Sequence, residues 1–184
     1  VYSARIIVCQ GGSMQTTALL YGKAGTNGSI TVNKYVSNSG ADRSSLSEDE
    51  KKASPAIFGV HGDEVVYNIV ITSTYTNAVT VNVSDVFETN KTHGGLVISD
   101  YTGWTQKAAN SYSRTVTIPA GSSETVTLKV KTYSKVLKDS TVDYSSSYVD
   151  GAVAYEETYK NTVTITGSGL NIAKNTTADY VKVG

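Results

Sequence analysis

Hydrophobic and polar residues alternate over several stretches of this chain, as they do in β-strands that bury one face. The alternation is clearest over 29–37, 64–75, 79–87, 124–133 and 152–165, and shorter strands are expected over 96–98, 114–118 and 178–183. A polar insertion, 37–54, carries Ser47 ahead of acidic and then basic residues, which predicts a helix of one or two turns before Pro55. Strands at this spacing, divided by glycine, asparagine and serine turns, predict an all-β sandwich with Greek-key connections.

The N-terminal segment 1–28 differs from the rest of the chain, and a single sandwich domain is expected over 29–184. A short strand is predicted over 3–10 and a second extended piece over 16–21. The segment is expected either to form the first hairpin of the domain or to serve as an arm that adds to a sheet edge of a neighbouring subunit. In the second case the assembly strand consists of Arg5, Ile6, Ile7 and Val8.

The charge and hydropathy of the chain exclude some classes of binding partner. The 184 residues carry a formal net charge of zero and only 17% charged residues, which predicts neither nucleic acid nor an anionic membrane as partner. The chain has no apolar run of 18 residues, so no membrane insertion is expected. Cys9 is its one cysteine, which excludes an intrachain disulfide. Because the first residues lack the features of a signal peptide, an exported protein is expected to be in its mature form.

Three polar residues occupy positions that the alternation assigns to the core. Lys34 is in phase with Val32 and Val36, Asp85 with Val83 and Phe87, and Asn161 with Val163 and Ile165. Each has an ordinary explanation, since a lysine near a strand end can reach water and Asp or Asn can begin a turn. For all three together that explanation is less satisfactory. Buried charges must be paired or neutral, because an isolated one costs several kcal/mol.

The three residue types together can make a covalent bond. A desolvated lysine can act as a neutral amine nucleophile, and a desolvated aspartate can carry a proton. Asp85 would polarise the side-chain carbonyl of Asn161, Lys34 would attack it, and ammonia would leave. The resulting amide would close a loop of more than a hundred residues, which in the chain-entropy model contributes about 4 to 5 kcal/mol.

Segments from the whole sandwich region carry a resemblance to a known family. They are Ile30–Val36, Gly62–Ile71, Val81–Phe87, Ile118–Val126 and Lys160–Ile165. In their order and spacing, over about 29–183, the chain resembles the isopeptide-forming Ig-like domains of Gram-positive fimbrial subunits and adhesins, and related repeats of bacterial and archaeal surface proteins. The resemblance implies an Ig-like fold and places Lys34, Asp85 and Asn161 on the nucleophile, proton shuttle and acceptor. Because the related repeats include members without a crosslink, the bond remains a hypothesis.

The resemblance also implies a role outside the cell. The expected function is that of a structural subunit of a cell-surface filament or fimbria, with copies of itself as partners and no cofactor. The chain has no Leu-Pro-x-Thr-Gly signal and no pilin lysine motif, so sortase polymerisation is not predicted. The alternative is an Ig-like adhesin module that binds a glycan or a host or matrix protein through its tyrosine-rich loops or the Trp104 loop. Neither function is that of an enzyme, beyond a single-turnover self-crosslinking reaction.

Other candidate chemistries have weaker support. Cys9–Gln10 with Thr105–Ala108 loosely resembles a thioester-forming surface domain, and Cys9 with His61 or His93 has no protease signature, so a plain buried thiol is expected. Asp139, Asp143 and Asp150 match no calcium loop, so no metal site is predicted. A stacking surface for carbohydrate or a second subunit is a further hypothesis for Tyr133, Tyr144, Tyr148, Tyr155 and Tyr159.

Overall fold

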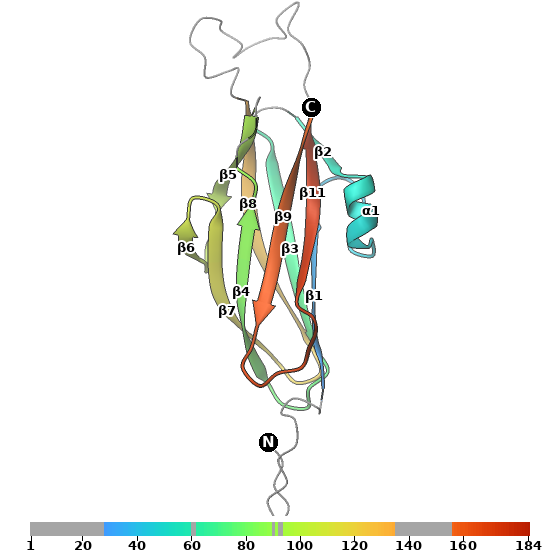
Figure 1. Ribbon diagram of the computed structural model, residues 1–184, viewed down its shortest axis with the longest axis vertical. Coiled ribbons are helices and arrows are strands. Elements are labelled where there is room, and N and C mark those ends of the chain that lie inside the picture. Colours follow the sequence, from blue (N-terminus) through green and yellow to red (C-terminus); the bar gives the residue numbers. More distant parts are fainter. Residues whose placement is uncertain (1–27, 60–61, 90, 92–93, 135–155) are drawn as a thin grey trace, which may run out of the picture.

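A computed structural model describes residues 28–59, 62–89, 91, 94–134 and 156–184, which form a two-layer β-sandwich with one short helix on its side (Figure 1). The described elements are β1 (Ile30–Val36), α1 (Glu48–Ala53), β2 (Ala56–Phe58), β3 (Glu64–Ser73), β4 (Val79–Phe87), β5 (Gly94–Asp100), β6 (Thr105–Ala108), β7 (Ser111–Ile118), β8 (Ser123–Ser134), β9 (Glu157–Thr166), β10 (Ile172–Lys174) and β11 (Thr176–Val183). The predicted assembly strand, Arg5 to Val8, lies outside these residues.

The two sheets pair strands that are distant in sequence. One sheet has the order β10-β1-β3-β8-β5 and the other the order β2-β11-β9-β4-β7-β6. Pairing is antiparallel except at two edges, where β10 runs parallel to β1 and β2 runs parallel to β11. The architecture is an Ig-like all-β sandwich, which confirms the predicted fold class.

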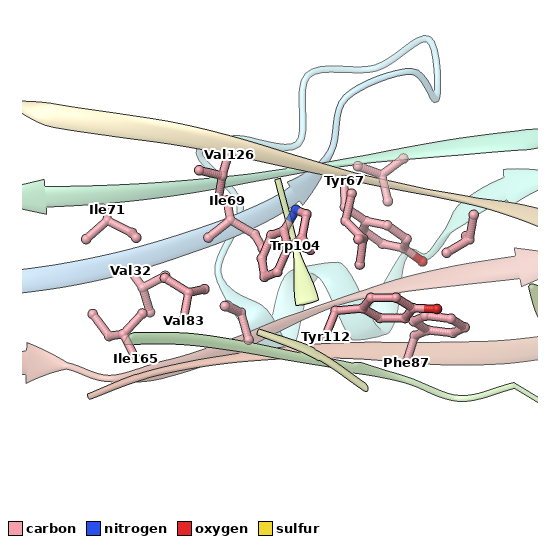
Figure 2. Packing of buried hydrophobic residues seen from close by; sticks show 14 of the residues in the cluster. Val32, Tyr67, Ile69, Ile71, Val83, Phe87, Trp104, Tyr112, Val126 and Ile165 are labelled. Carbon is pink, nitrogen blue, oxygen red and sulfur yellow. The ribbon is translucent and has the colours of Figure 1, made fainter. Parts of the chain in front are cut away.

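The strands bury the residues that the alternation of hydrophobic and polar positions assigns to the core. In β1 and β4 every second residue is buried, and the same holds for β9 from Tyr159 onwards. Side chains of both sheets meet in one core, with Ile69 and Ile71 on one side and Val83 and Ile165 on the other (Figure 2). Three strands were not predicted, β2, β6 and β10. Each has only three or four residues and lies at a sheet edge, where a short strand needs no buried face.

The polar insertion after β1 forms the predicted helix and is fastened to the sandwich. Ser47 caps α1 in a reciprocal capping box with Glu50, which satisfies free backbone donors of the first turn. Lys51, in the last turn, is buried and donates from Nζ to Asn33 Oδ1 at 3.0 Å and to the Lys34 carbonyl oxygen at 2.6 Å. The helix therefore fixes the backbone of β1 at Lys34.

The Trp104 loop turns its indole inward. Gly103 has a φ of +86°, a backbone conformation that favours glycine, and Trp104 beside it is only 7% exposed. Its Nε1 donates to the Thr127 carbonyl oxygen at 2.9 Å, and the ring lies within the core cluster (Figure 2). The indole thus closes the core, so of the two surfaces named for the adhesin alternative the Trp104 loop does not present its indole to a ligand.

We expect Trp104→Ala to lower the free energy of unfolding by about 3–5 kcal/mol, because it removes a large buried aromatic side chain. Denaturation in urea measures this loss. Val97→Ala is the control, since Val97 is 48% exposed and its truncation should cost less than about 0.5 kcal/mol. A Trp104→Ala protein as stable as the Val97→Ala protein would contradict the inward placement.

Candidate functional site

The three inward polar residues meet across the middle of the sandwich. Lys34 comes from β1 in one sheet, while Asp85 and Asn161 come from the neighbouring strands β4 and β9 of the other. In the β4–β9 pairing Phe87 lies opposite Asn161, and Asp85 is two residues before Phe87. Asp85 and Asn161 are therefore diagonal neighbours on the same inward face. All three side chains are fully buried, which confirms the inward phase predicted for them.

Lys34 and Asp85 form a completely buried pair. Lys34 Nζ lies 2.5 Å from Asp85 Oδ2, and both side chains are 0% exposed. Burial lowers the pKa of Lys34 and raises the pKa of Asp85, and in each residue the attraction of its partner's charge opposes the effect of burial. Both pKa values move toward the neutral forms. A proton can therefore pass along this short contact and leave a neutral amine beside a neutral carboxylic acid.

Asn161 lies next to this pair with its amide unsatisfied. Among the described residues, six buried side-chain nitrogen or oxygen atoms have no hydrogen-bond partner, and four of them belong to this site: Tyr67 Oη, Asp85 Oδ1, Asn161 Oδ1 and Asn161 Nδ2. The approach of the Asn161 amide lowers the pKa of Asp85 and of Tyr67 against the larger effect of burial, which places the amide beside both groups. An unsatisfied buried polar group costs about 1–3 kcal/mol, so this concentration of such groups marks the trio as the candidate functional site.

A second buried acid flanks Asn161 but is fully engaged. Asp179 on β11 pairs directly with Asn161 in the register of β9 and β11. Its Oδ1 accepts hydrogen bonds from Arg43 Nη2 at 2.6 Å and the Tyr180 amide at 2.7 Å. Its Oδ2 accepts from the Val36 amide at 2.8 Å and Arg43 Nε at 3.1 Å. Both oxygens are occupied, so Asp85, whose Oδ1 is free, is the acid that can act on Asn161.

Sequence reasoning missed four residues around the trio. Asp179 could have been found, because it is in phase with Val181 and Val183 just as Asp85 is with its neighbours. Arg43 and Lys51 come from the polar insertion, where no periodicity marks an inward side chain. Tyr67 is in phase with the valines and isoleucines of β3, but its pattern does not distinguish it from an ordinary core tyrosine.

The other candidate residues do not form a site in the described part of the chain. Thr105–Ala108 forms the exposed edge strand β6, and the thioester, protease and calcium candidates Cys9, Gln10, His61, His93, Asp139, Asp143 and Asp150 lie outside the described residues. Of the five tyrosines of the proposed stacking surface, only Tyr133 and Tyr159 are described, and Tyr159 is buried. The described residues contain no group of three His, Cys, Asp or Glu side chains arranged to hold a metal ion. They also contain no helix with the length and apolar character needed to cross a bilayer.

Comparison with known proteins does not identify a family for this chain. The sequence matches no family model. It also matches no curated protein. Among solved structures, the chain is similar to the CARDB domain of a Pyrococcus furiosus protein in complex with di-metal ions, at 12% identity and a TM-score of 0.47, covering 89% of this chain and 95% of that one. It is also similar to the RrgB pilus protein of Streptococcus pneumoniae, at 16% identity and a TM-score of 0.40, covering 80% of this chain and 24% of that one.

Proposed function

We propose that this protein is a structural module of an extracellular filament or fimbria, stapled by an amide bond between Lys34 and Asn161. The observation that carries the proposal is the fully buried Lys34–Asp85 pair beside an asparagine whose amide has no hydrogen-bond partner among the described residues. This combination does not serve stability, since a core with apolar residues of similar volume at these positions would be as stable or more stable. A bond-forming reaction needs all three residues.

The reaction balances without any added reagent. The Lys34 ammonium passes one proton to Asp85, and the neutral amine attacks Cγ of Asn161 while the carbonyl π electrons move to Oδ1. Asp85 then returns its proton to the amide nitrogen Nδ2, and the attacking nitrogen gives up one of its own protons to Asp85. The Cγ–Nδ2 bond breaks as the carbonyl re-forms, so the products are a secondary amide, ammonia and protonated Asp85.

The position of the bond suits a protein that bears tension. β1 begins at one end of the long axis and β11 ends at the other, so a pull between the ends of the domain acts along the strands (Figure 1). Lys34 lies on β1, and Asn161 lies on β9, which pairs along its length with β11. An amide between them would join the first described strand to the last hairpin of the domain. The pulling force would then be carried by the covalent bond, and most strands of the sandwich would not bear it.

Intact mass under denaturing conditions tests the crosslink. The wild-type chain is expected to weigh less than its sequence by one ammonia, and Lys34→Ala is expected to have its full calculated mass. Lys182→Ala is the control that should keep the ammonia deficit, because Lys182 lies on β11 outside the trio and pairs with Glu156 at 2.7 Å. A wild-type chain of full mass would overturn the proposed bond, as would an ammonia loss that persists in Lys34→Ala.

Assembly is proposed to occur by donation of Arg5–Val8 to a sheet edge of the next subunit, where unpaired backbone groups accept a strand. The described sheets end at β10, β5, β2 and β6, which provides four such edges. Light scattering should detect polymers of the full chain and only monomers of a chain lacking residues 5–8. Monomers in both samples would refute assembly and leave the crosslink untouched.

The rate of crosslinking should be nearly independent of pH over the neutral range. The reactive neutral pair and the resting ion pair of Lys34 and Asp85 hold the same number of protons, so no proton enters or leaves before attack. We expect the rate to vary by less than about twofold across the neutral range, since the pair exchanges no proton with solvent before the attack. Crosslinking followed by intact mass at several pH values measures this. A tenfold rise per pH unit would instead indicate an amine that loses its proton to solvent.

A further inference from the structure

Tyr67 reaches the trio from the sheet that carries Lys34, opposite the sheet that carries Asp85 and Asn161. It lies on β3 and pairs with Val36 of β1, two residues beyond Lys34. Its ring is fully buried, and the Lys34 Nζ lies over the ring face, 4.4 Å from the centroid. Figure 2 shows Tyr67 directed from its own sheet toward the sheet that carries Phe87. Phe87 is the strand partner of Asn161, so the Tyr67 hydroxyl points to the region of the amide.

The hydroxyl of Tyr67 is a hydrogen-bond donor without an acceptor in the described residues. Tyr67 Oη is buried and has no hydrogen-bond partner among the described residues, and the Asn161 amide lies beside it, close enough to lower its pKa against the larger effect of burial. Burial raises the pKa of Tyr67, and the neighbouring carboxylates Asp85 and Asp179 raise it further, so the phenol holds its proton more firmly than an exposed tyrosine does. Buried tyrosine hydroxyls usually have a partner, and this one lacks it before the reaction.

We propose that the Tyr67 hydroxyl donates a hydrogen bond to Asn161 Oδ1 as that oxygen becomes negatively charged, and so acts with Asp85 as the second donor of an oxyanion site. The inference rests on the proposed crosslinking function. When Lys34 attacks Cγ, the carbonyl electron pair moves to Oδ1, and the resulting charge forms in a site without water. A donor fixed in position beforehand stabilises such a charge more than it stabilises the neutral amide. Tyr67 itself loses and gains no proton.

Two parts of one side chain would then serve the same reaction. The ring face holds the Lys34 nitrogen over it, while the hydroxyl stabilises the electrophile. After ammonia leaves, the hydroxyl remains bound to the oxygen of the new amide. The crosslinked product thereby satisfies two of the atoms that have no partner before the reaction, Tyr67 Oη and Asn161 Oδ1.

The test is the rate of ammonia loss in newly made full-length chains. Chains are synthesised in a short cell-free translation pulse, quenched in denaturant at successive times and weighed intact. Tyr67→Phe keeps the ring and removes only the hydroxyl, and we expect crosslinking to be slower by about 10²- to 10³-fold, as when one oxyanion donor is removed. The final extent of crosslinking should still be complete, because the three reacting residues are unchanged.

Tyr112→Phe is the matched control. Tyr112 is also a fully buried tyrosine, on the strand next to β4, but its hydroxyl donates to the Ala109 carbonyl oxygen at 3.3 Å. Its crosslinking rate should stay within about twofold of wild type, because no donor to Asn161 is lost. A Tyr67→Phe chain that crosslinks at the wild-type rate would overturn the role of Tyr67 and leave the crosslink standing. A wild-type chain that never loses ammonia would overturn both.

A second variant tests the role of the Tyr67 hydroxyl if Tyr67→Phe fails to fold. Site-specific 3-fluorotyrosine at position 67 preserves the shape of the side chain and makes the phenol more acidic, and therefore a stronger donor. Its crosslinking should be faster than that of wild type. An unchanged or slower rate in the folded fluorinated chain would count against the proposed hydrogen bond.

Discussion

Asn161→Ala is expected to lower the melting temperature by about 10–20 °C, because it removes a covalent closure worth on the order of 5 kcal/mol and leaves the Lys34–Asp85 ion pair in place. The amide would close a loop of more than a hundred residues. Closing so long a loop restricts the unfolded chain far more than it changes any contact of the folded one. Thermal unfolding of wild type and variant, with intact mass determined on the same samples, measures both effects together.

Asn68→Ala provides the comparison for the loss of an ordinary asparagine. Asn68 is half-buried on β3, and within the described part of the chain its side chain donates to Tyr35 Oη and accepts from Thr127 Oγ1. We expect this variant to lose about 1 kcal/mol or less and to keep the ammonia deficit. If Asn161→Ala melts within a few degrees of Asn68→Ala, the stabilisation does not come from a covalent bond.

The inward phase of the trio was predictable because strands alternate with a strict period of two. The apolar residues in phase with Lys34, Asp85 and Asn161 indicate the face to which each polar residue belongs. The same alternation gave the two-sheet class. It also gave the long strands to within a few residues, since these strands bury one face along most of their length.

The contacts between these strands were not predictable from a single sequence. Alternation says that Tyr67 and Asp179 point inward, but not which inward residues meet, because that depends on strand order and on how the sheets pack. Arg43 reaches Asp179 from a loop that has no period at all. The short strands β2 and β10 are held by parallel pairing at sheet edges, which leaves no alternating signature.

Asp85→Ala is expected to be the most damaging single substitution in the site. It prevents crosslinking and also leaves Lys34 as a buried cation without its partner, a change that costs about 3–5 kcal/mol. Together with the lost crosslink this approaches the whole stability of an ordinary domain, about 5–15 kcal/mol. Urea denaturation at pH 7 should therefore show Asp85→Ala to be less stable than Asn161→Ala, although neither variant can form the bond.

The penalty in Asp85→Ala should disappear as the pH rises. Burial lowers the pKa of Lys34 in the folded chain below its ordinary value of 10.5, and removal of Asp85 takes away the main effect that opposes burial. Between the two pKa values the unfolded chain binds more protons than the folded one, so stability increases with pH up to the unfolded pKa. The stability of Asn161→Ala, in which the lysine and the aspartate share one proton, should change less between pH 7 and pH 10.

The double variant Lys34→Met/Asp85→Leu is the control. It has no buried charge at this pair and should be at least as stable as Asn161→Ala at every pH. Equal pH dependence in Asp85→Ala and in this double variant would show that Lys34 is not held as a desolvated amine, and the nucleophile of the proposed reaction would be lost.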